Sequence, residues 1–569
     1  MKILGLNHDM YISSAALIVD GKVVAACAEE RLNREKLTRV FPSKAVNYCL
    51  QKVNIKLDQI DYIANSYNPA VLLKKFNPIF SNHRRFRGDY YYSIPDFLLN
   101  NERQVKEDSD YSCQKIRLGK KELDIYYITH HLCHAANGFY LSPFKKSAIL
   151  TADSAGEDDS ANFLIGDKSN IKLLKKLKIP HSTGSFYSTF TDFFGYKPES
   201  DEWKIMALSA YGSKNNKYYK IIKNMVNLKP DGSFTLDQSY FKQHLHTFPN
   251  FYTDDFVRLL GTPKKKNEKF TKRDFEIASA MQQVFEDICS HMLKYLYRAT
   301  RVKNLVLSGG SFMNSVFNGK AHKISQFDNV WLSSCPDDSG QSIGSALYLY
   351  NKILKKKNRY ELKHNFLGPS FKSDEIKKDL VKYKINFIYK KNISEIVSQK
   401  LANGKLVGWF QGRMEFGQRA LGNRSILADP RDLSSKNRVN SAVKYREKFR
   451  PFAPAVIDKY AHEFFDLKKG EKVPFMEKVV LVKKEKRRLI PAVVHKDFTA
   501  RVQTVDSKTN KIFHNLINDF YKITGVPVLL NTSFNLNGEP IVCNPTDAIR
   551  TFYSCGLDLL VMDNYLIYK

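Results

Sequence analysis

Three short apolar runs at the start of the chain place the strongest constraint on its fold. They cover residues 3–7, 15–19 and 23–28, and Asp20-Gly21 separates the second run from the third. An Asp-Gly pair between two apolar runs predicts a β-hairpin, because both residues tolerate the positive φ angles of a tight hairpin turn. The first run ends in a polar loop that begins with His8. We therefore expect three antiparallel strands to open an α/β domain.

The apolar patterns that follow alternate between strand and helix, which favours an α/β class. Residues 148–153 and 304–307 predict short strands. Residues 271–301 predict a long helix, because apolar side chains recur there at helical spacing. Residues 339–350 predict a second helix, whose small side chains would let it pack closely on a sheet. Residues 213–270 show no clear period, and we interpret them as an insertion.

A linker divides the chain into two predicted domains. Residues 355–357 are three lysines, and Gly368-Pro369-Ser370 is typical of a turn or loop. Ser373 then predicts the cap of a new helix. The predicted boundaries are residues 1–356 for the first domain, 357–372 for the linker and 373–569 for the second domain.

Charge and cysteine content narrow the partners and the compartment. The net charge is +32, from 90 Lys and Arg against 58 Asp and Glu. The basic residues do not gather in one helix with interleaved aromatics, so we expect a solvated basic surface and no nucleic acid partner. The 8 cysteines are too sparse for a disulfide framework, which favours reduced thiols in the cytoplasm. They form no C-x-x-C pair, which argues against a zinc ribbon or a thioredoxin-type motif. Apolar stretches are shorter than the ~18 residues of a transmembrane helix. The N-terminal run from Met1 to Asp9 meets a charge too early for the apolar core of a signal peptide.

Four residues form a candidate metal site. His130 and His134 are four positions apart and would share one face of a helix. Asp153 ends a predicted strand, and Asp338 precedes a glycine-spaced segment. Such nitrogen and oxygen ligands suit iron, manganese or zinc rather than calcium. His131 stands where a zinc protease of the H-E-x-x-H class has its glutamate, which argues against that class. The alternative is a pair of packed histidines with aspartates that cap turns.

Two segments could hold phosphate groups. Gly309-Gly310 follows a predicted strand, so the backbone could approach a ligand closely, although a tight turn would use the same residues. Residues 412–427 place arginines among glycines and apolar residues, and Arg450 and Arg501 follow. Arginine binds phosphate or carboxylate through two parallel hydrogen bonds. The polar residues 531–535 could hold a ligand or form a structural turn.

Together these motifs resemble the O-carbamoyltransferase family that includes the tobramycin, cephamycin and nodulation-factor enzymes. The resemblance covers nearly the whole chain. It implies an actin-like (ASKHA) fold for the first domain and a YrdC-like α/β fold for the second. The matching stretches are His8 with residues 13–16, residues 29–31 with Arg34 and Lys36, and residues 130–136, 202–208, 308–314, 338–344, 412–430, 449–454 and 531–542.

The resemblance also implies roles for individual residues. A divalent metal, iron by this resemblance, would be held by His130, His134, Asp153 and Asp338. The nucleotide would be bound by Gly309, Gly310, Asn314, Glu202 and Lys204. Carbamoyl phosphate would be held by Arg419, Arg450 and Arg501, with Arg424, Asn531 and Ser533 as further contributors. His8 would be the general base for the acceptor hydroxyl, and Lys36 would contact the adenylate.

The implied reaction uses ATP with magnesium and carbamoyl phosphate. The second domain would cleave carbamoyl phosphate to carbamate, and reaction with ATP would convert carbamate to carbamoyladenylate with release of pyrophosphate. In the first domain, a hydroxyl of a sugar or natural product would then attack the carbamoyl group, and AMP would leave. The basic composition points to an anionic or lipid-linked acceptor. The alternatives are a tRNA-modifying enzyme of the threonylcarbamoyl type and a nucleotide-binding regulator without activity, and a homodimer is left open. Phe498 and Ser154 stand where family members often have Gly, which adds bulk near the expected ligand loops.

Overall fold

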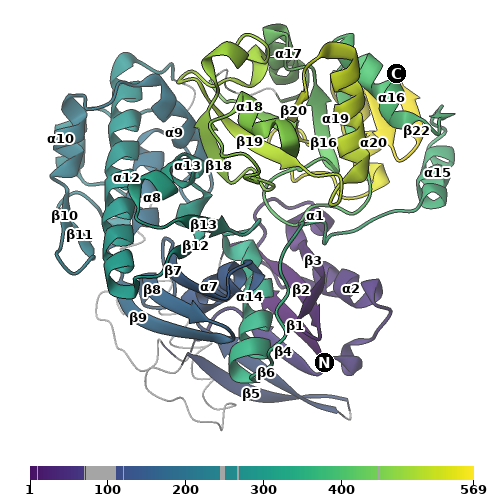
Figure 1. Ribbon diagram of the computed structural model, residues 1–569. Helices are drawn as coiled ribbons and strands as arrows, with labels where there is room; N and C mark the ends of the chain where they lie inside the picture. Colours follow the sequence, from purple (N-terminus) through teal and green to yellow (C-terminus); the bar gives the residue numbers. More distant parts are fainter. Residues whose placement is uncertain are drawn as a thin grey trace. The chain divides into compact units, whose positions relative to one another are not determined.

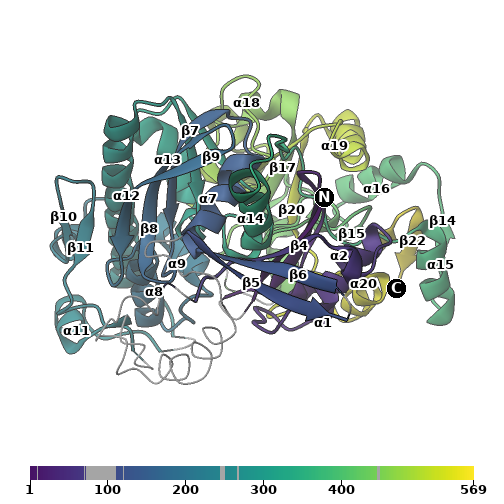
Figure 2. The ribbon, with the colours of Figure 1, turned by 90° about the horizontal axis from the view of Figure 1, so that it is seen from below.

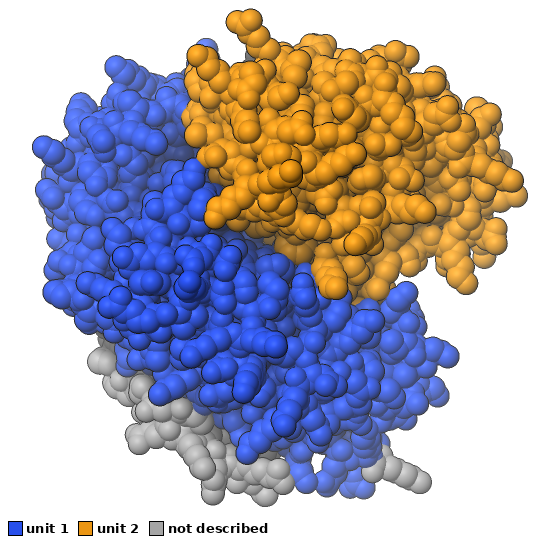
Figure 3. Space-filling model, viewed as in Figure 1, with its two compact units in different colours: residues 1–24, 40–42, 49–362 blue, residues 25–39, 43–48, 363–569 orange. Residues whose placement is uncertain are grey.

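The computed structural model divides into two compact units, which Figure 3 colours separately. It describes residues 1–8, 11–69, 71, 110–119, 121–243, 250–265, 268–444, 447 and 449–569. Unit 1 contains residues 1–24, 40–42 and 49–362, and unit 2 contains residues 25–39, 43–48 and 363–569. Unit 2 therefore includes two short stretches from the N-terminal part of the chain. The predicted domain boundaries stay a prediction.

The first sheet of unit 1 begins with the three expected antiparallel strands. Asp20 and Gly21 have φ angles of 48° and 83°, as a tight hairpin turn between β2 and β3 requires. The strand order is β3-β2-β1-β4-β6-β5, with β4 parallel to β1. The strands are β1 (Lys2–Asn7), β2 (Ser14–Val19), β3 (Lys22–Ala28), β4 (Tyr62–Asn65), β5 (Tyr111–Leu118) and β6 (Lys121–Ile128).

A second sheet of unit 1 repeats this arrangement. Its order is β13-β12-β7-β8-β9, with β7, β8 and β9 antiparallel and β12 parallel to β7. Two sheets that both start with three antiparallel strands and continue with parallel ones confirm the actin-like fold. The strands are β7 (Lys146–Ala152), β8 (Asp159–Asp167), β9 (Asn170–Lys178), β12 (Asn304–Ser308) and β13 (Asn329–Leu332).

Two helices, α7 (His130–Leu141) and α14 (Gln341–Tyr348), pack against each other and connect the two sheets of unit 1 (Figures 1 and 2). α14 lies against β1 and β2, whereas α7 lies against β7 and β12. Small residues allow this close contact: a Cβ atom at Gly5 would lie 1.8 Å from the carbonyl oxygen of Ser342. The small-residue helix predicted after residue 339 is therefore confirmed, and it brings both sheets to one place.

The remaining helices of unit 1 follow the expected signals. The predicted long helix is α12 (Lys272–Thr300), which begins with a capping box between Thr271 and Asp274. The residues interpreted as an insertion form two short helices and a separate two-stranded sheet; residues 244–249 and 266–267 lie outside the described part. The further elements are α8 (Thr183–Phe193), α9 (Glu202–Leu208), α10 (Lys217–Lys223), β10 (Val226–Leu228), β11 (Phe234–Leu236), α11 (Asp254–Leu260) and α13 (Ser315–Ile324). The helix α2 (Ser43–Lys52) is divided between the units, with residues 43–48 in unit 2 and the rest in unit 1.

Unit 2 is built on one mixed sheet, in the order β14-β22-β21-β15-β16-β20-β17-β19-β18. This α/β architecture agrees with the YrdC-like fold expected for this part of the chain. Ser373 is the first residue of α15, and Lys372 occupies the cap position that the sequence assigned to Ser373. Among the described residues, no helix has both the length and the apolar character needed to cross a membrane.

The strands of unit 2 are β14 (Ile388–Tyr389), β15 (Val407–Phe410), β16 (Arg424–Ala428), β17 (Ala453–Ile457), β18 (Lys478–Leu481), β19 (Thr499–Val505), β20 (Val528–Ser533), β21 (Leu559–Met562) and β22 (Tyr565–Tyr568). Its helices are α1 (Glu29–Asn33), α15 (Ser373–Lys382), α16 (Ile393–Ala402), α17 (Leu433–Val439), α18 (Ala461–Phe464), α19 (Lys511–Thr524) and α20 (Pro545–Tyr553).

Candidate functional site

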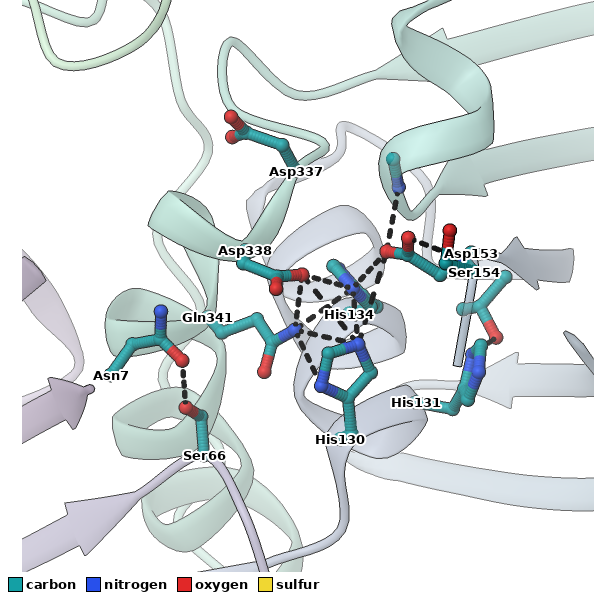
Figure 4. Close-up of polar contacts among 12 residues, drawn as sticks. Asn7, Ser66, His130, His131, His134, Asp153, Ser154, Asp337, Asp338 and Gln341 are labelled. Carbon is teal, nitrogen blue, oxygen red and sulfur yellow. Dashed lines mark hydrogen bonds and ion pairs between the residues drawn. The ribbon is translucent and has the colours of Figure 1, made fainter. Parts of the chain in front are cut away.

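The four predicted metal ligands meet where three elements of unit 1 end or begin (Figure 4). His130 and His134 lie on the first turns of α7, Asp153 directly follows β7, and Asp338 opens the turn before α14. One ligand atom from each residue lies within 4.8 Å of the other three. His131, between the two histidines, faces away and contacts Thr151 through Nδ1 at 2.9 Å. Both histidines therefore point to the same cluster, as their spacing predicted.

The distances within this cluster suit a single cation. His134 Nε2 lies 3.1 Å from Asp153 Oδ2 and 3.3 Å from Asp338 Oδ1. His130 Nε2 lies 3.1 Å from His134 Nε2 and 3.6 Å from Asp338 Oδ1. Two imidazole nitrogens and two carboxylate oxygens are a donor set for iron, manganese or zinc. The residues present therefore fit a divalent metal.

The charges in the cluster depend strongly on one another. Burial alone would lower the pKa of His130, but the carboxylates of Asp338 and Asp153 raise it to about 9. Burial would raise the pKa of Asp153, but hydrogen bonds with His130 and His134 hold it well below its usual value. Two carboxylates thus place negative charge where a cation would bind.

Glu157 fixes the helix that carries the histidines. Its buried carboxylate accepts hydrogen bonds from the backbone N–H of His130 at 3.0 Å and from that of Asn68 at 2.8 Å. A carboxylate at a helix N-terminus satisfies an N–H group that has no partner within the helix. Sequence analysis overlooked Glu157, although its place four residues after Asp153 was a usable signal.

The glycine segment, Gly309-Gly310 after β12, lies directly against this cluster. The backbone N–H of Gly310 donates to Asp153 Oδ2 at 2.8 Å. Gly309 has a φ angle of 103°, and a Cβ atom there would lie 2.2 Å from the carbonyl oxygen of Ala152. Only glycine fits this position without strain. The structure thus brings Gly309 and Gly310 to the metal cluster, where the backbone could approach a phosphate.

The side chain of Asn314, a predicted nucleotide contact, is occupied by protein partners. Its Oδ1 accepts from the backbone N–H of Phe317 at 3.0 Å and caps α13. Its Nδ2 donates to Gln282 Oε1 at 2.9 Å, which ties α13 to α12. The geometry therefore gives this side chain a supporting role beside the glycine segment.

Glu202 and Lys204, the other two predicted nucleotide contacts, contact different groups of residues. Glu202 accepts from Ser188 Oγ at 2.7 Å, and burial raises the pKa of its carboxyl to about 7. Glu202 also lies near Tyr11: burial first, and then the charge of Glu202, raises the pKa of this phenol well above its usual value. The ammonium group of Lys204 contacts Asp201 at 3.1 Å and lies 4.5 Å from the ring centre of Tyr196. These contacts join Lys204 to the residue before α9 and to an aromatic ring.

His8 follows β1 at the end of the strand that leads to the cluster. Asn7, the residue before it, pairs with Ser14, and Ser14 Oγ donates to the carbonyl oxygen of Ser339 at 2.8 Å, next to Asp338. The His8 ring is half-buried and meets Phe41 at a centroid distance of 5.3 Å. Lys36 lies in an exposed turn after α1, within unit 2.

The predicted carbamoyl phosphate residues of unit 2 come together through strand register. Asn531 on β20 pairs with Ala453, so Arg450, just before β17, lies at the same end of the sheet. β19 pairs in parallel with β17, which brings Arg501 near that end. Arg419, Arg450 and Arg501 are all partly exposed, as a ligand contact would require.

Arg424, in contrast, is turned into the core of unit 2. Its side chain is fully buried, and its guanidinium donates to the carbonyl oxygens of Gln411 at 2.6 Å, Asn423 at 2.9 Å and Cys543 at 3.3 Å. It also stacks on Phe410 at 3.6 Å from the ring centre. These contacts show that Arg424 supports the loop, and its expected contact with carbamoyl phosphate stays a prediction.

Other buried polar groups hold the loop that carries Arg419. Glu415 Oε1 accepts from the backbone N–H groups of Leu421 at 2.7 Å and Asn423 at 2.8 Å. Asn531 Nδ2 donates to Gln503 Oε1 at 2.8 Å and to the carbonyl oxygen of Ala420 at 3.2 Å. Asn531 thus positions the loop. Sequence analysis did not single out Glu415 or Gln503; a charged residue between Met414 and Phe416 was the available signal.

The predicted contributor Ser533 is also engaged with protein groups. Its hydroxyl donates to Asn535 Oδ1 at 2.7 Å, and its carbonyl oxygen accepts from the buried Lys444 Nζ at 2.6 Å. Lys444, which the sequence did not single out, fixes the end of β20.

The N-terminal stretch of unit 2 reaches the same loop. Arg31 pairs with Glu30 at 3.1 Å and donates to the carbonyl oxygen of Gly417 at 3.1 Å, two residues before Arg419. Arg34 donates to the carbonyl oxygens of Pro540 and Ile541 at 2.8 Å and 2.6 Å. Residues 25–39 therefore support the loop that carries Arg419, which runs from β15 to β16 (residues 411–423, the arginine loop).

Phe498 and Ser154, which stand where family members often have Gly, have different surroundings in the structure. Phe498 has a φ angle of 64°, in the region that favours glycine, but its ring is 52% exposed and lies against Arg487. Its bulk therefore points to solvent. Ser154 lies close to Gly184, where an added Cβ atom would be 2.5 Å from the Ser154 nitrogen.

Comparison with known proteins adds independent evidence. The family profile described as "Carbamoyltransferase N-terminus" matches residues 2–347, and that described as "Carbamoyltransferase C-terminus" matches residues 398–569. An uncharacterized protein of Synechocystis, sll1178, is 34% identical over 100% of this chain and 96% of its own length. Nodulation protein NolNO of Sinorhizobium fredii is 35% identical over 99% of this chain and 80% of its own.

More distant similarities extend to a named enzyme and a solved structure. The 3'-hydroxymethylcephem-O-carbamoyltransferase of Streptomyces clavuligerus is 27% identical over 76% of this chain and 78% of its own. The activator of the 2-hydroxyisocaproyl-CoA dehydratase from Clostridium difficile, solved with bound ADPNP, aligns with a TM-score of 0.34 and 15% identity over 62% of this chain and 96% of that chain.

Proposed function

The chain belongs to the carbamoyltransferase family, and from this premise we propose that it is an ATP-dependent O-carbamoyltransferase for a hydroxyl of a sugar or natural product. The observation that carries the proposal is that one chain holds both a metal-ligand cluster beside a glycine segment and a row of partly exposed arginines. The first suits a nucleotide phosphate, and the second suits a phosphorylated donor. Residues 1–356 would contain the transfer site and residues 373–569 the donor site, joined by the linker.

The donor step would use the arginines of unit 2. Water attacks carbamoyl phosphate, which gives carbamate and phosphate, and Arg419, Arg450 and Arg501 stabilise the charge on the leaving phosphate. Carbamate oxygen then attacks the α-phosphorus of ATP, so the bond to the β-phosphate oxygen breaks and pyrophosphate leaves. The product is carbamoyladenylate. Lys36 stays our candidate for a cation that contacts its phosphate.

The transfer step would use the residues of unit 1. His8 takes the proton of the acceptor hydroxyl, whose oxygen attacks the carbamoyl carbon, and AMP leaves. Gly309 and Gly310 would receive the nucleotide phosphate with their backbone. His130, His134, Asp153 and Asp338 would hold a divalent metal, iron in our proposal, which supplies a positive charge that polarises the phosphate or carbonyl oxygen.

The acceptor is proposed from chemistry alone. The cephem relative is named for an acceptor with a hydroxymethyl group, which supports a small-molecule hydroxyl. The net charge of +32 supports an anionic or lipid-linked sugar.

Pyrophosphate release tests the donor half of this proposal without knowledge of the acceptor. The purified, metal-loaded protein is mixed with magnesium, ATP and carbamoyl phosphate. We expect release that depends on carbamoyl phosphate, that Arg450→Met reduces at least about tenfold and that His134→Ala largely retains. Release that depends on threonine and bicarbonate instead would show the tRNA-modifying type of enzyme and refute the proposal.

A further inference from the structure

Gln341 places its amide group inside the proposed metal cluster (Figure 4). It is the first residue of α14, and its side chain is 0% exposed. Its Nε2 lies 2.9 Å from His134 Nε2, 3.0 Å from His130 Nε2 and 3.0 Å from Asp338 Oδ1. No other side chain outside the four ligands comes this close to three of them among the described contacts. The amide thus faces the point on which the ligands converge.

Hydrogen bonding does not account for this placement. An amide nitrogen carries two hydrogens, whereas Nε2 also lies 3.1 Å from Nδ1 of the His130 ring and so faces the ring between its two nitrogens. Its Oε1 is buried and has no hydrogen-bond partner among the described residues. A buried acceptor without a partner is costly. Half a turn about the last side-chain bond exchanges the two atoms, which have nearly the same shape.

We propose that Gln341 is a fifth protein ligand of the metal, through its amide oxygen. The amide oxygen is the only atom of this group that can bind a cation, and such oxygens are ordinary metal ligands. A fifth protein ligand favours ions that accept five or six ligands over zinc in a four-coordinate site. This inference rests on the metal site of the proposed function.

Cobalt(II) provides the test, because its visible spectrum reports the number of ligands and its titration reports affinity. The full-length protein is stripped of metal and titrated with Co²⁺. Gln341→Leu removes the oxygen, and Gln341→Glu keeps one. Asn351→Leu is the matched control, because Asn351 is a buried amide about 15 Å further along the same helical run. Gln341→Ala gives the same readings if Gln341→Leu does not fold.

We expect Gln341→Leu to raise the Kd for Co²⁺ about tenfold and to increase the intensity of the visible bands, as loss of a ligand does. Gln341→Glu should keep the wild-type band pattern and bind at least as tightly, and Asn351→Leu should match the wild type. A weaker Kd with an unchanged spectrum would overturn ligation, because the amide would then only orient Asp338. An unchanged Kd and spectrum would also overturn it. Failure of the wild type to bind Co²⁺ would refute the metal site itself.

Discussion

The buried guanidinium of Arg424 allows a quantitative test of how the arginine loop is built. Arg424→Met keeps the length of the side chain and its contact with Phe410, but it removes every hydrogen bond to the carbonyl oxygens of Gln411, Asn423 and Cys543. It also leaves the carboxylate of Glu415, 4% exposed, without the nearby positive charge. Removing one partner of a buried charged network costs about 3–5 kcal/mol. We expect the free energy of unfolding of unit 2 to fall by that amount.

Trp409 reports on unit 2, because it is buried there and its indole N–H donates to the carbonyl oxygen of Gly422 at 2.9 Å. Trp203 and Trp331 belong to unit 1 and are replaced by Phe in all proteins compared. Urea unfolding is followed by the fluorescence of Trp409. Arg550→Met is the control, since this side chain is 55% exposed and should cost less than about 1 kcal/mol. A change of less than 1 kcal/mol for Arg424→Met, together with a lost response to carbamoyl phosphate, would refute the structural role.

Three further predictions use other parts of the chain. Arg31→Met should destabilise unit 2 by about 3 kcal/mol in the Trp409 assay, because Glu30 loses a buried partner; an effect on unit 1 alone would contradict the assignment of residues 25–39 to unit 2. Asn314→Ala should lower stability by about 1 kcal/mol in thermal unfolding, since the cap of α13 is lost, and Asn314→Asp should lose less; equal effects would argue against capping. His8→Ala should retain pyrophosphate release without acceptor but lose transfer of the carbamoyl group; loss of both activities would exclude His8 as the base of the transfer step alone.

The sequence was sufficient for features that local patterns determine. The hairpin at Asp20-Gly21 and the long helix α12 follow from turn residues and apolar spacing, and both are confirmed. The metal cluster could be assembled because His130 and His134 are one helical turn apart and Asp153 ends a strand. Parallel neighbouring strands bring such chain positions to one edge of a sheet.

Features that depend on side-chain direction could not be predicted in this way. Arg419 and Arg424 both stand among glycines and small residues, yet the first is partly exposed and the second is buried against carbonyl groups. Whether an arginine faces solvent or the core depends on the pairing of β16 with β20, a strand that lies far from β16 in the sequence. For the same reason, the inclusion of residues 25–39 in unit 2 was not visible, since it depends on contacts of Arg31 and Arg34 with residues about 400 to 500 positions away.

The identity of the nucleotide product tests the central claim most directly. Phosphorus NMR of the full-length, metal-loaded protein with ATP, magnesium and carbamoyl phosphate distinguishes cleavage next to the α-phosphate from cleavage of the terminal phosphate. We predict AMP and pyrophosphate in equal amounts, formed only when carbamoyl phosphate is present, and no ADP. Formation of ADP and phosphate would show a kinase-type reaction and would contradict an adenylated carbamoyl intermediate.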